Sequence, residues 1–144
     1  FDLSKQKEEE LFLETLRTFA KYEESKRHIS KVIELLRASR SVKEAIMELG
    51  NSTYVFEAFP LALFIFLRHT EDPLTAFWEG VNACGPVGGD TDAIGYMVGS
   101  MVGAYHGLEV FPGELLENLE NYSYYIKLTE RLYDKTMEFI ERRS

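Results

Sequence analysis

Acidic residues dominate the charge of this 144-residue chain: 24 Asp and Glu stand against 16 Lys and Arg, a formal net charge of −8. Such a balance leaves no broad basic surface to neutralise a phosphate backbone, so we expect no nucleic-acid partner. With 45% hydrophobic and 13% aromatic residues, the chain can bury one core of its own and is too short for two domains.

Cys84 is the single cysteine, which excludes an internal disulfide and a multi-cysteine zinc site. We therefore expect a reducing compartment and a cytoplasmic location. Residues 93–108 form an uncharged run, but it is shorter than the roughly 20 residues that a bilayer requires, so we expect no membrane span. The chain begins at Phe1 rather than methionine, and we expect it to be part of a longer protein.

The start of the chain has the apolar period of amphipathic helices. This period predicts one helix over residues 5–25 and a second over residues 29–38. The apolar side chains expected to face inward in the first helix are Leu11, Phe12, Leu16, Phe19 and Ala20. Charged residues between them are available for the solvent-facing side.

The middle of the chain predicts a short capped helix and then a buried one. Ser41 and Glu44 have the spacing of a capping box, and Gly50 is expected to end the helix that they begin. Residues 55–69 are apolar on almost all sides, which is typical of a helix buried in a core. Pro60 interrupts this segment, and we expect a kink or a late start of the regular helix there.

A second capping signal follows. Asp72 before Pro73 predicts a helix that continues to about Val81. Glycine and proline in residues 85–89 break the chain, and a further helix is predicted from residue 90 or 91 to about Tyr105.

One or two more helices are predicted to follow residues 111–113 and to finish the chain. Their expected inward stripe consists of Leu128, Leu132, Met137 and Ile140. No segment has a convincing alternation of a strand. The predicted fold is therefore all-α, a compact orthogonal array of several helices rather than a long parallel bundle.

Two aspartates, Asp90 and Asp92, follow the glycine pair Gly88 and Gly89 at a helix start. Because the first lies on turning backbone, both carboxylates can converge on one cation, and their hard oxygens suit Mg²⁺ or Mn²⁺. The glycines permit a sharp turn, and Gly89 is where we expect a ligand to approach the backbone closely.

Two other interpretations of these residues remain open. An aspartate at an N-cap and another in the first turn are ordinary capping chemistry. Glycines before a helix can also form a nest for a phosphate, although two aspartates would repel that anion and no lysine follows.

The helix after the aspartates has a stripe of glycines at four-residue spacing: Gly95, Gly99, Gly103 and Gly107. Each glycine costs about 1 kcal/mol relative to alanine inside a helix, so close packing must offset the loss. The stripe predicts that another element lies directly against this helix.

Glu57 is the one carboxylate in the apolar 55–69 segment. Buried carboxylates need a partner. We expect Glu57 to hydrogen-bond the loop of Gly88 and Gly89, or to support the site from behind the direct ligands.

The run GGDTDAIGYMVGSMVGAYHGLEVFP resembles the second metal motif of the ADP-ribosylglycohydrolases. The stretches STYVFEAFPLALFIF and DPLTAFWEGVNACG are similar to what precedes that motif in the family. The resemblance implies an all-α fold with two Mg²⁺ or Mn²⁺ ions, and Asp90 and Asp92 match metal-binding aspartates. The next position is usually Thr or Ser and also ligates metal, but here it is Ala93.

The family's first metal motif, a hydroxyl residue followed by two adjacent aspartates, has no counterpart in this chain. We therefore expect residues 1–144 to be the carboxy-terminal part of a single, incomplete domain. Its expected partner is the missing amino-terminal half or another subunit. Alone, the chain is expected to bind metal weakly and to hydrolyse almost nothing.

Two functions follow from the resemblance. The first is a metal-dependent hydrolase that cleaves an ADP-ribosyl linkage in a small molecule or protein, to which this chain supplies half of the binuclear site. The alternative is a non-catalytic helical binding or structural relative that keeps the fold without the activity. The intact run from Gly88 to Asp92 favours the first, and Ala93 favours the second.

Overall fold

The computed structural model describes residues 3–142. Within them every regular element is helical, which confirms the predicted all-α class. A boundary between Val110 and Phe111 divides the chain into two compact units. The first unit contains α1 Leu3–Phe19, α2 Glu23–Arg37, α3 Val42–Leu49, α4 Val55–Arg68, α5 Pro73–Val81, α6 Thr91–His106 and the 3₁₀ turn η1 Leu108–Val110. The second unit contains α7 Gly113–Glu117 and α8 Tyr122–Glu141.

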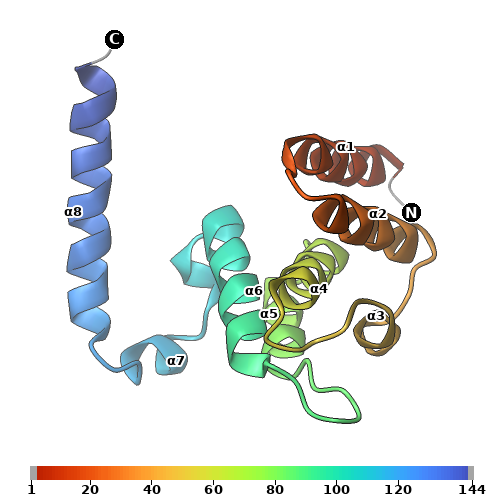
Figure 1. The fold of residues 1–144 in the computed structure, drawn as a ribbon. Coiled ribbons are helices and arrows are strands. Elements are labelled where there is room, and N and C mark those ends of the chain that lie inside the picture. The colour runs from red at the N-terminus through yellow and green to blue at the C-terminus, as the bar shows by residue number, and fades with distance from the viewer. Residues whose placement is uncertain (1–2, 143–144) are drawn as a thin grey trace. The chain divides into compact units, whose positions relative to one another are not determined.

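Helix α4 is the centre of the first unit and contacts α2, α3, α5 and α6. Figure 1 shows that the helices around it run in several directions instead of forming a parallel bundle. Residues 60–67 of α4 are all buried, with Phe64 fully enclosed, so the predicted buried helix is confirmed. Pro60 lies inside α4 without ending it. None of the described helices is long and apolar enough to cross a membrane.

Both predicted capping signals are confirmed. The Ser41 hydroxyl accepts a hydrogen bond from the Glu44 N–H at 3.3 Å, and the Glu44 carboxylate accepts one from the Ser41 N–H at 2.9 Å. The Ser41 backbone and hydroxyl, with Arg40 as a weaker contributor, lower the pKa of Glu44 to about 2. Asp72 likewise accepts from the Thr75 N–H at 3.1 Å, directly before α5.

The single helix predicted over residues 5–25 is wrong. Helix α1 ends at Phe19, the chain turns, and α2 begins at Glu23 and packs against α1. The predicted inward stripe is also wrong, because Leu11, Phe12 and Phe19 are exposed while Leu13 is fully buried. Helix α1 packs against α2 on one side, and Leu11, Phe12 and Phe19 lie on its exposed surface.

The inward stripe predicted near the end of the chain is not buried either. Helix α8 has no buried residue, and Leu128, Leu132, Met137 and Ile140 are all exposed. A helix buries an apolar face only against another element, and within this unit α8 has only the five-residue α7 as a neighbour. The pattern correctly predicted the helix but not its burial.

Helices α5 and α6 pack through glycines, as the stripe predicted. A Cβ at Gly95 of α6 would lie 2.7 Å from a methyl carbon of Val81, and one at Gly80 of α5 would lie 2.9 Å from Cβ of Val98. Each valine therefore fills the space that a glycine on the other helix leaves open. Gly107 has a different role, because it ends α6 with φ of 88°.

Candidate metal site

The two aspartates lie at the amino-terminal end of α6. Asp90 is the last residue before the helix, with φ −85° and ψ 62°, and Asp92 lies in the first turn. Their carboxyl groups are close enough to shift each other's pKa, so the structure brings the two predicted ligands together. Asp90 is half-buried and Asp92 is exposed to solvent.

The contact between the carboxyl groups shifts their proton affinities in opposite directions. The side-chain interaction with Asp92 raises the pKa of Asp90, and the same interaction lowers the pKa of Asp92. The backbone N–H of Ala93 faces both groups and favours their charged forms. Two carboxylates this close repel each other when both are ionised, and a proton or a cation between them removes the repulsion.

Asp90 does not form a regular helix cap. Its side chain makes no N-cap hydrogen bond of the kind that Ser41 and Asp72 make at their helices. An aspartate that capped α6 would turn its carboxylate toward the free amides of the first turn. The Asp90 carboxyl group is influenced by one of these amides, the Ala93 N–H, but its largest interaction is with Asp92.

A tight turn precedes the aspartates. The Gly85 N–H donates to the Gly88 carbonyl at 2.9 Å, and the Gly88 N–H donates back to the Gly85 carbonyl at 3.1 Å. Gly88 has φ of +95°, a conformation that side-chain-bearing residues rarely adopt, and this confirms the predicted turning role of the glycines. Val87 at the tip is 97% exposed.

Gly89 meets a different requirement. A Cβ on Gly89 would overlap the side-chain amide of Asn51 and would lie 3.0 Å from the Ala83 carbonyl oxygen. Its lack of a side chain thus makes room for Asn51. The role of Gly89 toward a substrate remains a prediction.

Asn51 is a residue that the sequence did not single out. Its side-chain N–H groups donate to the backbone carbonyls of Ala83 and Gly88 at 2.8 and 2.9 Å. Its backbone carbonyl accepts a hydrogen bond from the Asp90 N–H at 2.8 Å. These partners lie 32 to 39 residues away along the chain. The only local signal was a short polar residue between Gly50 and Ser52, which is typical of any turn.

Glu57 is held by the turn that contains Asn51. Its carboxylate accepts from the Ser52 hydroxyl at 2.6 Å and from the Ser52 N–H at 3.1 Å. It also fills the space beside Gly50, where φ is +83°. Glu57 is therefore linked to the glycine loop through the residues 50–52 turn, rather than by a bond of its own to Gly88 or Gly89.

The donor set suits a hard cation in part. Asp90 and Asp92 offer carboxylate oxygens from one helix end, and Mg²⁺ prefers an octahedral shell of oxygens that includes several waters. Ala93, the next residue, has no oxygen in its side chain. Over residues 3–142 no group of three or more His, Cys, Asp or Glu side chains is arranged to hold a metal ion. The pair therefore fits as one side of a coordination shell.

Comparisons with a family model and with individual known proteins point to the same family. The sequence model of ADP-ribosylglycohydrolase matches residues 3–139. The chain is 36% identical over 101 residues to ADP-ribosylhydrolase ARH3 of Homo sapiens and 37% identical over 101 residues to that of Mus musculus; each match covers 65% of this chain. The Gallus gallus protein of the same name is 31% identical over 115 residues, or 75% of this chain.

These relatives are much longer than this chain. The matched regions cover 28% of the human protein, 27% of the mouse protein and 31% of the chicken protein. No solved structure matches the chain significantly. Because the family's sequence model extends over nearly the whole described length, the chain belongs to the ADP-ribosylglycohydrolase family.

Proposed function

We propose that this chain supplies one side of the binuclear metal site of an ADP-ribosyl hydrolase, with Asp90 and Asp92 as its ligands for Mg²⁺ or Mn²⁺. One observation carries the proposal. The two carboxyl groups lie together at the start of α6 behind a tight glycine turn, and Asp90 forms no regular cap hydrogen bond. Residues 1–144 then form the carboxy-terminal part of a single domain.

The chain's own residues have three tasks in this proposal. Asp90 and Asp92 would hold the cation, and the Ala93 N–H favours the charged form of each carboxylate. The turn of Gly85 to Gly88 leads the chain directly into the two aspartates. A divalent ion held by these residues would supply Lewis-acid chemistry, which would act on the ribose hydroxyls of an ADP-ribosyl group and on the attacking water.

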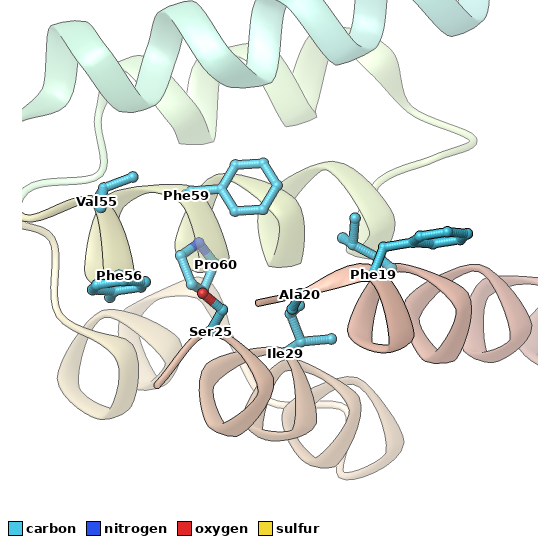
Figure 2. Close-up of a pocket in the computed structure, with 9 residues that line it drawn as sticks. Phe19, Ala20, Ser25, Ile29, Val55, Phe56, Phe59 and Pro60 are labelled. Carbon is cyan, nitrogen blue, oxygen red and sulfur yellow. The ribbon is translucent and has the colours of Figure 1, made fainter. Parts of the chain in front are cut away.

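Residues 3–142 hold no group of three or more His, Cys, Asp or Glu arranged around an ion, and we propose that the rest of the domain provides the remaining ligands. The relatives named above have more than two thirds of their length outside the matched region. The first unit also has an apolar groove of about 230 Å³ where α1, α2 and α4 meet (Figure 2). Phe19, Val55 and Phe59 line it and are exposed, an arrangement typical of a surface that another part of a protein covers.

The test begins with metal binding by the chain itself. Mn²⁺ is titrated into ¹⁵N-labelled chain, and paramagnetic broadening is followed at the amides of residues 88–93, with Mg²⁺ as competitor. Hydrolysis of ADP-ribosylated peptide is then measured with and without the coexpressed remainder of a matched relative. Local broadening, reversal by Mg²⁺ and turnover only in the presence of the complement are expected. Absence of local broadening, even with the complement present, contradicts the proposal.

Ala93 supports a second candidate function, a non-catalytic relative that binds or assembles without hydrolysis. A methyl group stands where the family usually places a hydroxyl ligand, so this side of the metal shell has one oxygen fewer. In the proposed hydrolase a water takes that position, since Mg²⁺ commonly retains several waters. Metal binding without turnover in the complemented protein would favour the second candidate.

Restoring the hydroxyl gives a direct test of the ligand set. Ala93→Thr is expected to tighten Mn²⁺ binding by about tenfold, because a fixed hydroxyl oxygen replaces a mobile water. Ala104→Thr, an exposed position in the last turns of α6, is the matched control and should leave the affinity unchanged. Equal affinities for both variants and the unmodified chain would show that residue 93 does not face the ion.

A further inference from the structure

Asn51 joins three parts of the chain that surround the aspartates. Its side-chain nitrogen donates to the carbonyl of Ala83, just after α5, at 2.8 Å. The same nitrogen donates to the carbonyl of Gly88 at 2.9 Å. Of the common short polar side chains, only an amide offers two N–H donors on one planar nitrogen, and both are used here.

The backbone of Asn51 holds the third part. Its carbonyl accepts a hydrogen bond from the Asp90 N–H at 2.8 Å, immediately before α6. The loop is thus bound to one residue at its start, at its glycine turn and at the aspartate itself. The side chain is half-buried, where lost hydrogen bonds are not fully replaced by water.

The surroundings of Asn51 are built to keep it in place. Gly89 has no Cβ to obstruct its amide, and Gly85 approaches the same amide closely enough that a Cβ would lie 3.3 Å from it. On the other side, Glu57 fixes the next residue, Ser52, by two hydrogen bonds. The turn of residues 50–52 therefore keeps Asn51 in place, and Asn51 in turn keeps the glycine loop of residues 85–89 in place.

We propose that Asn51 is a positioning residue, which sets the glycine loop and the Asp90 carboxylate in the geometry that binds the cation. This inference rests on the proposed function of Asp90 and Asp92. Metal ligands must be held within a fraction of an ångström, and groups behind the direct ligands usually provide that restraint. The Asp90 backbone is held on both sides, because its carbonyl accepts from the Ile94 N–H of α6 at 3.0 Å and its N–H donates to the Asn51 carbonyl at 2.8 Å.

The experiment compares Asn51→Ala with two controls in the same chain. Asn118→Ala removes an amide that donates to the Glu114 carbonyl on α7, so it is chemically matched. Ile65→Val lowers core stability without touching the loop, because Ile65 is fully buried in α4. The two readouts are Mn²⁺ affinity from paramagnetic broadening and hydrogen exchange of the Gly88 and Asp90 amides.

Asn51→Ala is expected to weaken Mn²⁺ binding by about tenfold, the lower end of what lost supporting groups do to metal affinity. Exchange of the Gly88 and Asp90 amides should accelerate in the same variant, while both controls keep the original affinity and loop protection. If the unmodified chain binds Mn²⁺ and Asn51→Ala binds it equally well, the inference is overturned and the proposed function stands. If the unmodified chain shows no binding that depends on Asp90 and Asp92, both are overturned.

Discussion

Asp92→Asn and Asp90→Asn are each expected to reduce Mn²⁺ affinity by roughly 100-fold or more, because each removes one of the two charged ligands proposed here. The amide that replaces the carboxylate keeps the size of the side chain but not its charge. The measurement is the same paramagnetic broadening at the amides of residues 88–93. Asp134→Asn, on the exposed surface of α8, is the matched control.

The stability of the metal-free protein shows whether Asp90 is a metal ligand or a structural residue. Asp90 makes no N-cap hydrogen bond, and the two carboxylates repel each other when both are charged. The melting temperature of Asp90→Asn in EDTA should therefore be no lower than that of the unmodified chain. If the melting temperature falls markedly while Mn²⁺ affinity is unchanged, Asp90 is a capping residue and not a metal ligand.

The second large effect is expected at Gly95. Gly95→Ala would place a Cβ 2.7 Å from a Val81 methyl carbon and 3.2 Å from the Val81 Cα, and the backbone atom cannot rotate away. We expect a net destabilisation of about 1–3 kcal/mol, the usual range for overpacking. Urea unfolding followed by circular dichroism measures the change. Because Val81 ends α5 and Gly95 lies near the start of α6, the strain arises close to the glycine loop that joins the two helices.

Gly99 supplies the control for this prediction within the same helix. A Cβ at Gly99 would lie 3.5 Å from the ring of Phe77, which is ordinary contact. Gly99→Ala should therefore be neutral or stabilising by up to about 1 kcal/mol, since alanine favours a helix over glycine. Equal effects at the two positions would contradict the packing of α6 on α5 described above.

The amino-acid sequence determined those features that depend on residues close together in the chain. The capping box of Ser41 and Glu44 and the start of α5 at Asp72 follow from side chains that reach an amide three residues away. The buried helix α4 follows from a run so apolar that no face could remain in water. The pairing of Asp90 and Asp92 could also be predicted. The two residues are only two positions apart in the sequence, and where the backbone turns into a helix such residues can lie side by side.

Tertiary structure alone decided which apolar faces are covered and what holds the site. Leu11, Phe12 and the α8 stripe have the same pattern as buried residues, but burial requires a second element on that face. Gly95 and Gly99 have equivalent positions in the glycine stripe. Val81 leaves no room for a side chain at Gly95, whereas Phe77 leaves room for one at Gly99. The hold of Asn51 on the glycine loop spans more than 30 residues, a distance over which no local spacing rule applies.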